Sequence, residues 1–213
     1  MTLVDLTLPI TTASTGQPAA LPEKWAIAAG DLSYTANVYQ FSHDSMAGTY
    51  IDFPGHIEHT HDGKDASTYP LEKLYRLSSQ VIRLDREDGS GLVSAKELAQ
   101  ASNDDGGTAH ALVINALGDR RFDEIRYRSV YLGREAVDWI IGQGIHLLVS
   151  DIYESDDAPQ CVFPALFGAG ISTICNPVNL HLLRGRRIRI TALPLRFPTV
   201  TQLPCRLLAE TEE

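Results

Sequence analysis

Three side chains that can exchange protons fall within one short segment of the chain, residues 46–56. They are Tyr50, Asp52 and His56. An imidazole titrates near neutral pH, so it can accept and return a proton within one turnover. A carboxylate four residues earlier can orient that imidazole or act as a base itself. If Asp52 is buried with no cation beside it, burial should raise the pKa of its carboxyl group. The segment therefore predicts acid/base catalysis by these three residues.

Simpler roles compete with catalysis at two of these positions. Asp52 could cap a turn or accept hydrogen bonds from the backbone. The Tyr50 phenol could donate a hydrogen bond to a substrate carbonyl or to a developing enolate, or its ring could merely fill space. The residue types alone leave both alternatives open.

The same segment resembles the signature H-x-G-T-H-x-D-x-P-x-H of the cyclase/kynurenine formamidase-like family. Five residues stand at the expected spacings, namely Gly48, Thr49, Asp52, Pro54 and His56. Further stretches resemble the family along nearly the whole chain, at residues 5–7, 62–63, 69–72, 144–155, 170–171, 179–180 and 203–206. The resemblance implies that His56 is a general acid/base and that residues 1–213 form a single cyclase-like domain.

The resemblance also implies where a metal would bind in other members of the family. There, the two signature histidines, the aspartate, and a histidine and glutamate twelve residues apart hold divalent ions. In this chain the four non-aspartate positions are Met46, Tyr50, Phe163 and Cys175, so only Asp52 is kept. A thioether, a phenol and a phenyl ring cannot replace the nitrogen, sulfur and carboxylate donors that such ions need. We expect no bound metal and no other cofactor.

The substituted positions also predict the walls of a substrate pocket. Met46 and Phe163 would make the emptied pocket apolar. Cys175 could be a nucleophile only if its thiolate were stabilised, and we favour a buried, inert thiol. By resemblance, Ser155 and Asp156 shape the pocket. The full set of predicted substrate-binding residues is Met46, Trp25, Phe53, Tyr153, Phe163, Cys175 and Ser155.

Two further histidines lie close to the signature. His59 and His61 would share one face of an extended segment. The polar residues Glu58, Asp62 and Lys64 surround them, which favours an exposed loop over a second metal site.

Hydrophobic periodicity predicts an α/β fold in which strands outnumber helices. Strands are expected at residues 3–8, 37–41, 80–85, 111–114, 145–149, 171–175, 188–193 and 206–209, with a loop at 11–23. Helices are expected at 94–101, 134–143 and from 163, the first of them begun by the capping box of Ser94 and Glu97. The family resemblance implies a swivelling β/β/α arrangement with a mixed, partly barrel-like sheet flanked by a few helices.

Composition limits the class of partner. The net charge of −9 argues against nucleic acid, which needs a concentrated basic face. The one basic cluster, Arg184, Arg186, Arg187 and Arg189, is interpreted as the solvated face of a strand. No signal peptide or membrane span is visible, and three scattered cysteines do not form a disulfide framework. We expect a reduced, cytoplasmic protein.

Three functions are consistent with these observations. The first is a metal-independent cyclase, dehydratase or isomerase that acts by acid/base catalysis on a small, largely apolar biosynthetic intermediate, such as a polyketide-type precursor. The second is a formamidase-type amide or lactone hydrolase that recruits a metal through other ligands. The third is a non-catalytic ligand-binding protein, against which the retained His56 argues. The family resemblance implies a homodimer or homotetramer.

Overall fold

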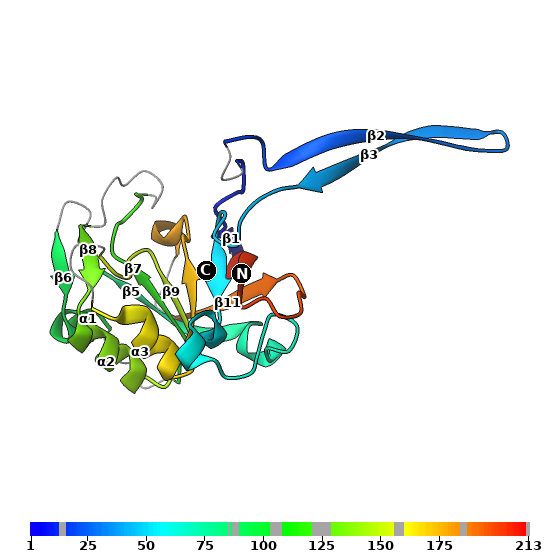
Figure 1. The fold of residues 1–213 in the computed structure, drawn as a ribbon. Coiled ribbons are helices and arrows are strands. Elements are labelled where there is room, and N and C mark those ends of the chain that lie inside the picture. The colour runs from blue at the N-terminus through cyan, green and yellow to red at the C-terminus, as the bar shows by residue number, and fades with distance from the viewer. Residues whose placement is uncertain are drawn as a thin grey trace.

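A large mixed sheet forms the centre of the protein in the computed structural model (Figure 1). The structure describes residues 1–12, 16–84, 86, 90–102, 108–120, 129–155, 160–183 and 187–211. The strand order is β1-β12-β11-β5-β7-β9-β10-β4. These strands are β1 (Thr2–Asp5), β4 (Tyr50–Asp52), β5 (Leu77–Arg83), β7 (Ala111–Asn115), β9 (Leu147–Ser150), β10 (Ser172–Cys175), β11 (Arg187–Pro194) and β12 (Gln202–Thr211).

The sheet closes on itself because β4 also pairs with β12. Seven strands therefore form a ring, and β1 extends it from the outer side of β12. Strands β5, β7, β9 and β10 run parallel, while β4, β11 and β12 join their neighbours antiparallel. The interior of the ring is filled by apolar side chains from all seven strands. The predicted α/β class and the mixed, barrel-like sheet are confirmed.

Three helices cover the outer face of the parallel strands (Figure 1). They are α1 (Ala95–Ser102), α2 (Arg134–Gly142) and α3 (Val162–Gly168). Alternation along each strand divides its side chains between two cores, because successive residues point to opposite faces. On β7, for example, Val113 faces the ring interior, whereas Leu112 and Ile114 pack toward the helices.

The predicted helices are confirmed to within two residues at their ends. The Ser94 hydroxyl accepts a hydrogen bond from the Glu97 backbone nitrogen at 3.3 Å, as the predicted cap requires. The Glu97 side chain instead pairs with Arg86, so the reciprocal half of the capping box is replaced by an ion pair. Two short strands outside the main sheet, β6 (Gly91–Val93) and β8 (Val130–Leu132), pair in parallel beside the helices.

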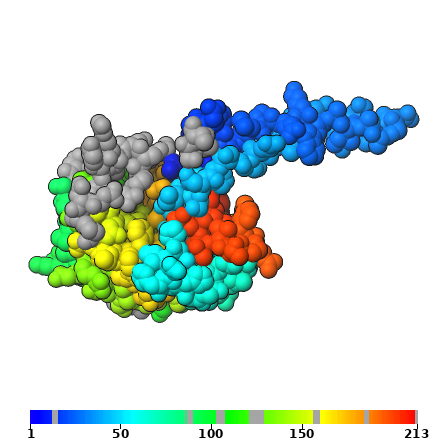
Figure 2. Space-filling model, in the orientation of Figure 1, coloured from blue at the N-terminus to red at the C-terminus, as the bar shows by residue number. Residues whose placement is uncertain are grey.

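A long β-hairpin projects from the body and is the main departure from the predicted elements (Figures 1 and 2). Its strands, β2 (Ala20–Ala29) and β3 (Leu32–Phe41), pair over their full length around the two-residue turn Gly30-Asp31. Gly30 has a φ of +61°, a conformation that glycine adopts without strain. The predicted strand at 37–41 is confirmed as the end of β3, which begins earlier than expected. The predicted loop at 11–23 is wrong from Ala20 onward, where β2 begins. Both faces of the hairpin lie largely in solvent. The first part of β3, from Leu32 to Val38, does alternate apolar and polar residues, whereas β2 has no regular alternation.

Two remaining expectations concern charge and membranes. Arg187 and Arg189 lie on β11 as predicted, while Arg184 and Arg186 fall outside the described residues. Within the described part of the chain, no helix has the length and apolar character needed to cross a membrane.

The core between the helices and the outer face of the ring can be tested directly through α3. Leu166 on α3 is fully buried, whereas Leu71 is 66% exposed. Leu166→Ala should lower the free energy of unfolding by about 2–5 kcal/mol, because it removes buried contacts and leaves a cavity. Leu71→Ala should change it by less than about 0.5 kcal/mol. Urea unfolding followed by circular dichroism would measure both, and equal effects would contradict this packing.

Candidate active site

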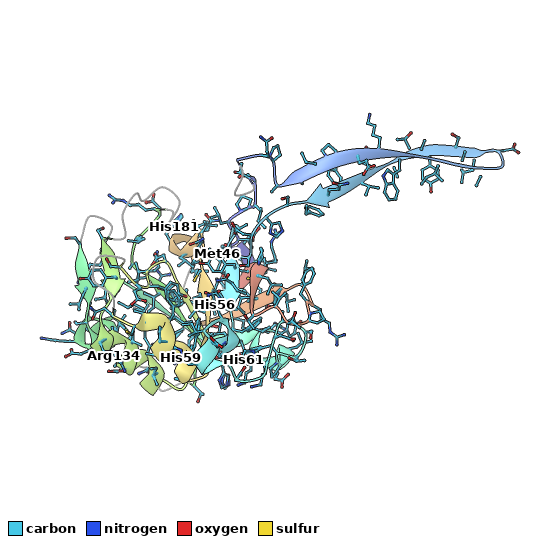
Figure 3. All side chains as sticks on the ribbon, in the orientation of Figure 1. Met46, His56, His59, His61, Arg134 and His181 are labelled. Carbon is cyan, nitrogen blue, oxygen red and sulfur yellow. The ribbon has the colours of Figure 1, made fainter. Side chains whose placement is uncertain are left out.

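A pocket of about 280 Å³ opens on the outer face of the ring, between β4, β10, α3 and the start of β12. It collects most of the residues singled out from the sequence. Its lining includes Met46, Tyr50, Asp52, His56, Tyr153, Phe163, Cys175 and Gln202. In Figure 3, Met46 and His56 lie beside β4 near the middle of the body, while His59 and His61 lie lower on the turns that follow.

Alternation along β4 places two acid/base candidates on this face. Tyr50 and Asp52 point outward to the pocket, and Ile51 points into the ring. The preceding Gly48 has a φ of +64°, and a Cβ atom there would lie 2.6 Å from the Leu8 carbonyl oxygen. Thr49 accepts a hydrogen bond from the Leu8 backbone nitrogen and donates one to the Asn176 carbonyl oxygen, both at 2.7 Å. The Gly-Thr pair of the signature thus anchors the start of β4.

Asp52 lies between two cross-strand neighbours. Thr173 on β10 and Gln202 on β12 are its register partners. The carboxyl group is only 3% exposed, and its Oδ1 atom has no hydrogen-bond partner among the described residues. Its Oδ2 atom is 3.7 Å from the Cys175 sulfur, which donates to it. One carboxyl oxygen is therefore buried without a hydrogen-bond partner among the described residues.

Burial raises the pKa of Asp52 above its ordinary value of 3.8. A hydrogen bond from Gln202 and the charge of a protonated His56 oppose this effect but do not cancel it. Burial also raises the pKa of the Cys175 thiol well above its usual range, with the Asp52 charge adding to the effect. The prediction that Asp52 gains proton affinity agrees with this environment, and Cys175 is held as a neutral thiol rather than a nucleophilic thiolate.

His56 ends a short 3-10 turn, Pro54–His56, that directly follows β4. Its ring is exposed at the pocket mouth and meets the Phe167 ring edge-on, with centroids 6.3 Å apart. Its Nε2 atom lies 3.3 Å from the Nε2 atom of Gln202. Among the described contacts, no hydrogen bond joins His56 to Asp52 directly. Of the two roles considered for Asp52, orienting the imidazole therefore has no direct hydrogen bond behind it among the described residues, and Gln202 lies beside both side chains.

Gln202 is the site residue that was not anticipated from the sequence. It precedes the stretch 203–206 that resembles the family, and it enters the site only because β12 closes the ring beside β4. The sequence around Gln202 does not indicate this contact, because Asp52 on β4 and Gln202 on β12 are 150 residues apart in the chain. A signal could have come only from the pairing of these two strands.

Apolar and aromatic side chains form most of the predicted wall. Tyr153 and Phe163 stack with centroids 5.2 Å apart, and the exposed Met46 lies at the pocket mouth. The Tyr153 hydroxyl donates to the Ile174 carbonyl oxygen at 2.7 Å and lies 3.1 Å from that of Leu148. Tyr153 therefore contributes a ring to the wall, and its hydroxyl is occupied by the backbone.

Three of the predicted wall residues do not line this pocket. Phe53 has the opposite strand parity from Asp52, so it is buried inside the ring against Tyr69. Trp25 is 51% exposed on the hairpin, away from the body. Ser155 is buried but does not border the cavity, and Asp156 lies outside the described residues.

A second buried carboxylate supports the floor of the pocket. Asp151 accepts hydrogen bonds from the backbone nitrogens of Ala116 and Leu117 at 2.9–3.0 Å and from the Asn115 amide at 2.9 Å. Burial raises its pKa, although these three donors oppose the effect. Asp151 holds the segment that follows β7, from which Leu117 lines the pocket. Its role is structural, since its oxygens are already engaged.

The donor set does not fit a divalent metal. The positions that resemble ligand positions supply one carboxylate, a thioether, a phenol, a phenyl ring and a thiol that burial keeps protonated. Within the described ranges, no three His, Cys, Asp or Glu side chains are grouped closely enough to hold an ion. His59 and His61 are exposed and lie outside the pocket.

The ring and its outer pocket define an α/β barrel-like protein with Tyr50, Asp52 and His56 in a pocket next to the closing strand. The chain belongs to the family described as Putative cyclase, whose sequence profile matches residues 4–157. This match confirms the resemblance noted from the signature. No curated protein sequence matches the chain significantly.

Solved structures share the fold at low sequence identity. Isatin hydrolase A from Ralstonia solanacearum is 20% identical, with a TM-score of 0.70 over 99% of this chain and 92% of its own. A potential metal-dependent hydrolase with cyclase activity is 19% identical, with a TM-score of 0.69 over 100% and 98%. A predicted metal-dependent hydrolase from Bacillus stearothermophilus is 19% identical, with a TM-score of 0.67 over 98% and 97%. These similarities establish the fold.

The raised pKa of Asp52 predicts how stability depends on pH. The folded state keeps the Asp52 proton to a higher pH than the unfolded chain does, so stability falls as pH rises from about 3.8 through the raised pKa. Asp52→Asn removes the free-energy cost of ionising a buried carboxyl group. The variant should therefore be more stable than wild type at pH 8, with the difference shrinking toward pH 4. Urea unfolding at both pH values would measure it.

Asp62→Asn is the matched control for this experiment. Slight burial opposes the shift, but hydrogen bonds and the charge of Lys64 hold the pKa of Asp62 below 3.8. The Asp62 variant should therefore lose stability relative to wild type at pH 8 and not at pH 3. A loss of stability in Asp52→Asn that is the same at pH 4 and pH 8 would contradict the environment described for Asp52.

Proposed function

We propose that this protein is a metal-independent enzyme of the cyclase family that moves protons on a small, largely apolar carbonyl compound. Cyclisation, dehydration and isomerisation all proceed through such proton transfers. The observation that carries the proposal is the buried Asp52, which lines an apolar pocket beside His56 and whose Oδ1 atom has no hydrogen-bond partner among the described residues. A neutral carboxylic acid in that position can donate a hydrogen bond to a substrate oxygen.

The residues divide the proton transfers between them. The neutral imidazole of His56 accepts a proton from the carbon next to the substrate carbonyl. The Asp52 acid donates a hydrogen bond to the carbonyl oxygen as negative charge develops there, and Tyr50 lies on the same face as a second donor. His56 then returns its proton to another carbon of the substrate in an isomerisation, or to the oxygen of the leaving hydroxyl group in a dehydration. Met46, Tyr153 and Phe163 surround the apolar part of the substrate and exclude water.

Hydrolysis is the second candidate, and the structural neighbours favour it. Several of them are isatin hydrolases or proteins described as metal-dependent hydrolases. A metal can make hydroxide available at neutral pH, but the donor set of this pocket does not suit such an ion. Metal dependence of turnover therefore separates the two functions.

Exchange of the protons next to a carbonyl gives a direct assay of the proposal. The wild-type protein should exchange the α-protons of 2-tetralone in deuterated buffer faster than buffer alone, as followed by proton NMR. His56→Ala should lower this rate by about 10²–10⁴-fold, because it removes the acid/base. His59→Ala, which removes an exposed histidine outside the pocket, should leave the rate unchanged.

Chelator provides the second arm of this assay. Exchange should persist in EDTA and should not increase with added zinc or manganese. Activity on 2-tetralone or isatin that is lost to EDTA and restored by either metal would overturn the proposal in favour of hydrolase-type chemistry. Wild-type exchange no faster than buffer would also contradict it.

We further propose that the partner of the hairpin is a second copy of this chain. Large apolar side chains are exposed along both strands, namely Leu21, Trp25, Leu32, Tyr34, Tyr39 and Phe41. A two-stranded hairpin is marginally stable in water without a further surface to cover it. Exchange of two such arms, with side chains that can each bury on the order of 100 Å², approaches the area of about 1,200 Å² or more that specific interfaces bury.

An apolar groove at the base of the arm is a suitable receptor. It is lined by Ile10, Phe41, Leu195, Phe197 and Leu203, among others, and has a volume of about 610 Å³. In a two-fold dimer each copy supplies one arm and one groove, so both surfaces would be covered in a single closed assembly. This arrangement would also give the exposed Trp25 a buried position.

Removal of the arm tests this assembly. A variant in which residues 22–39 are replaced by Gly-Ser should elute as a monomer of about half the wild-type mass in light-scattering chromatography. Trp25→Ser should weaken the dimer, whereas Lys24→Ser on the neighbouring strand position should not. A wild-type protein that is monomeric at micromolar concentration, or an armless variant that stays dimeric, would contradict the assignment.

A further inference from the structure

The first residue of β12, Gln202, connects the two groups of the proposed reaction. Its side chain is buried and lies opposite Asp52 in the pairing of β12 with β4. Its Oε1 atom accepts a hydrogen bond of 2.5 Å from the Ser45 hydroxyl. Its Nε2 atom lies 3.3 Å from His56 Nε2 and also donates to Asp52. One carboxamide thus contacts the acid, the base and an anchoring hydroxyl group.

The chemistry of these contacts determines the orientation of the amide. An amide nitrogen can only donate, and a carboxylate can only accept. With the nitrogen toward Asp52 and His56 and the oxygen toward Ser45, all three contacts of Gln202 are satisfied. A Ser45 hydroxyl that donates, as it does here, can meet only the amide oxygen, and the nitrogen end of the amide then meets the imidazole.

The Gln202 amide that donates to His56 Nε2 also determines the state of the other ring nitrogen, Nδ1. In neutral imidazole one nitrogen carries the hydrogen and the other accepts. Since Nε2 accepts from Gln202, the hydrogen of neutral His56 resides on Nδ1. The hydrogen bond made by one ring nitrogen sets the tautomer of the whole ring.

We infer that Gln202 is a positioning residue that holds neutral His56 as the Nδ1–H tautomer, with the lone pair of Nε2 directed toward Gln202 on the Asp52 side of the pocket. The catalytic meaning of this inference rests on the proposed function, whereas the tautomer itself does not. An imidazole nitrogen has one lone pair, so Nε2 can accept a substrate proton only when the substrate displaces the Gln202 amide from it. Gln202 would thus hold the base in place beside the acid until the substrate binds.

Nitrogen-15 NMR of the histidine side chains tests the tautomer directly. At a pH where His56 is neutral, long-range proton–nitrogen correlations distinguish the Nδ1–H from the Nε2–H form. The His56→Asn spectrum identifies the His56 signals among those of the seven histidines. The wild type should show His56 mainly as Nδ1–H, and Gln202→Leu should shift it toward Nε2–H.

Two further variants keep the test decisive. Ser45→Ala leaves Gln202 in place but releases its oxygen, so it should give a mixture of tautomers even if Gln202→Leu folds poorly. Gln143→Leu removes a glutamine that bonds only to the Trp139 carbonyl on the α2 surface and should leave the His56 signals unchanged. An Nε2–H form in the wild type, or an unchanged tautomer in both site variants, would overturn the inference.

The 2-tetralone exchange rate then separates this inference from the proposed function. Gln202→Leu should lower the rate by about 10²-fold or less, through misorientation of the base. A changed tautomer with an unchanged rate would overturn the positioning role. If the wild type shows no exchange but its tautomer depends on Gln202, the proposed function fails while the assignment of the His56 tautomer holds.

Discussion

Pairing of the three-residue strand β4 with both β10 and β12 is the constraint on which the rest of the structure depends. It closes the seven-stranded ring and so completes the inner core. The same pairing sets Asp52 between Thr173 and Gln202 and brings Cys175 opposite Tyr50. Because strand parity is fixed by this register, the residues that fill the ring and those that face the pocket cannot be exchanged. The fold and the site are consequences of one arrangement of hydrogen bonds.

The electrostatics of the pocket follow from burial without a compensating cation. An ionised carboxylate in such surroundings is unfavourable, and the pKa of Asp52 rises accordingly. The Cys175 thiol beside it stays protonated for the same reason. What would be a ligand sphere in a metal-binding relative is here a row of side chains that runs from Cys175 past Asp52 and Gln202 to His56. In the proposed function these side chains move protons.

The sequence predicted those features that depend on local pattern. Apolar runs located the buried strands, Ser94 marked the start of α1, and the spacing of Asp52 and His56 located the pocket. Errors arose where long-range geometry decides the outcome. Phe53 was assigned to the wall although its parity sends it into the ring, and Gln202 enters the site from a strand at the other end of the chain. The hairpin that carries Trp25 was missed although β3 alternates apolar and polar residues from Leu32 to Val38, because its partner β2 has no regular alternation and contains Pro22.

Direct observation of the Asp52 environment tests the central claim, which is that this carboxyl group acts as an acid in a pocket that holds no metal. Crystals of the protein grown with zinc or manganese, measured at the absorption edge of the metal, would show any ion by its anomalous signal. The account predicts no anomalous peak within bonding distance of Asp52. A peak about 2.0–2.2 Å from a carboxyl oxygen of Asp52, with further protein ligands around it, would contradict the account.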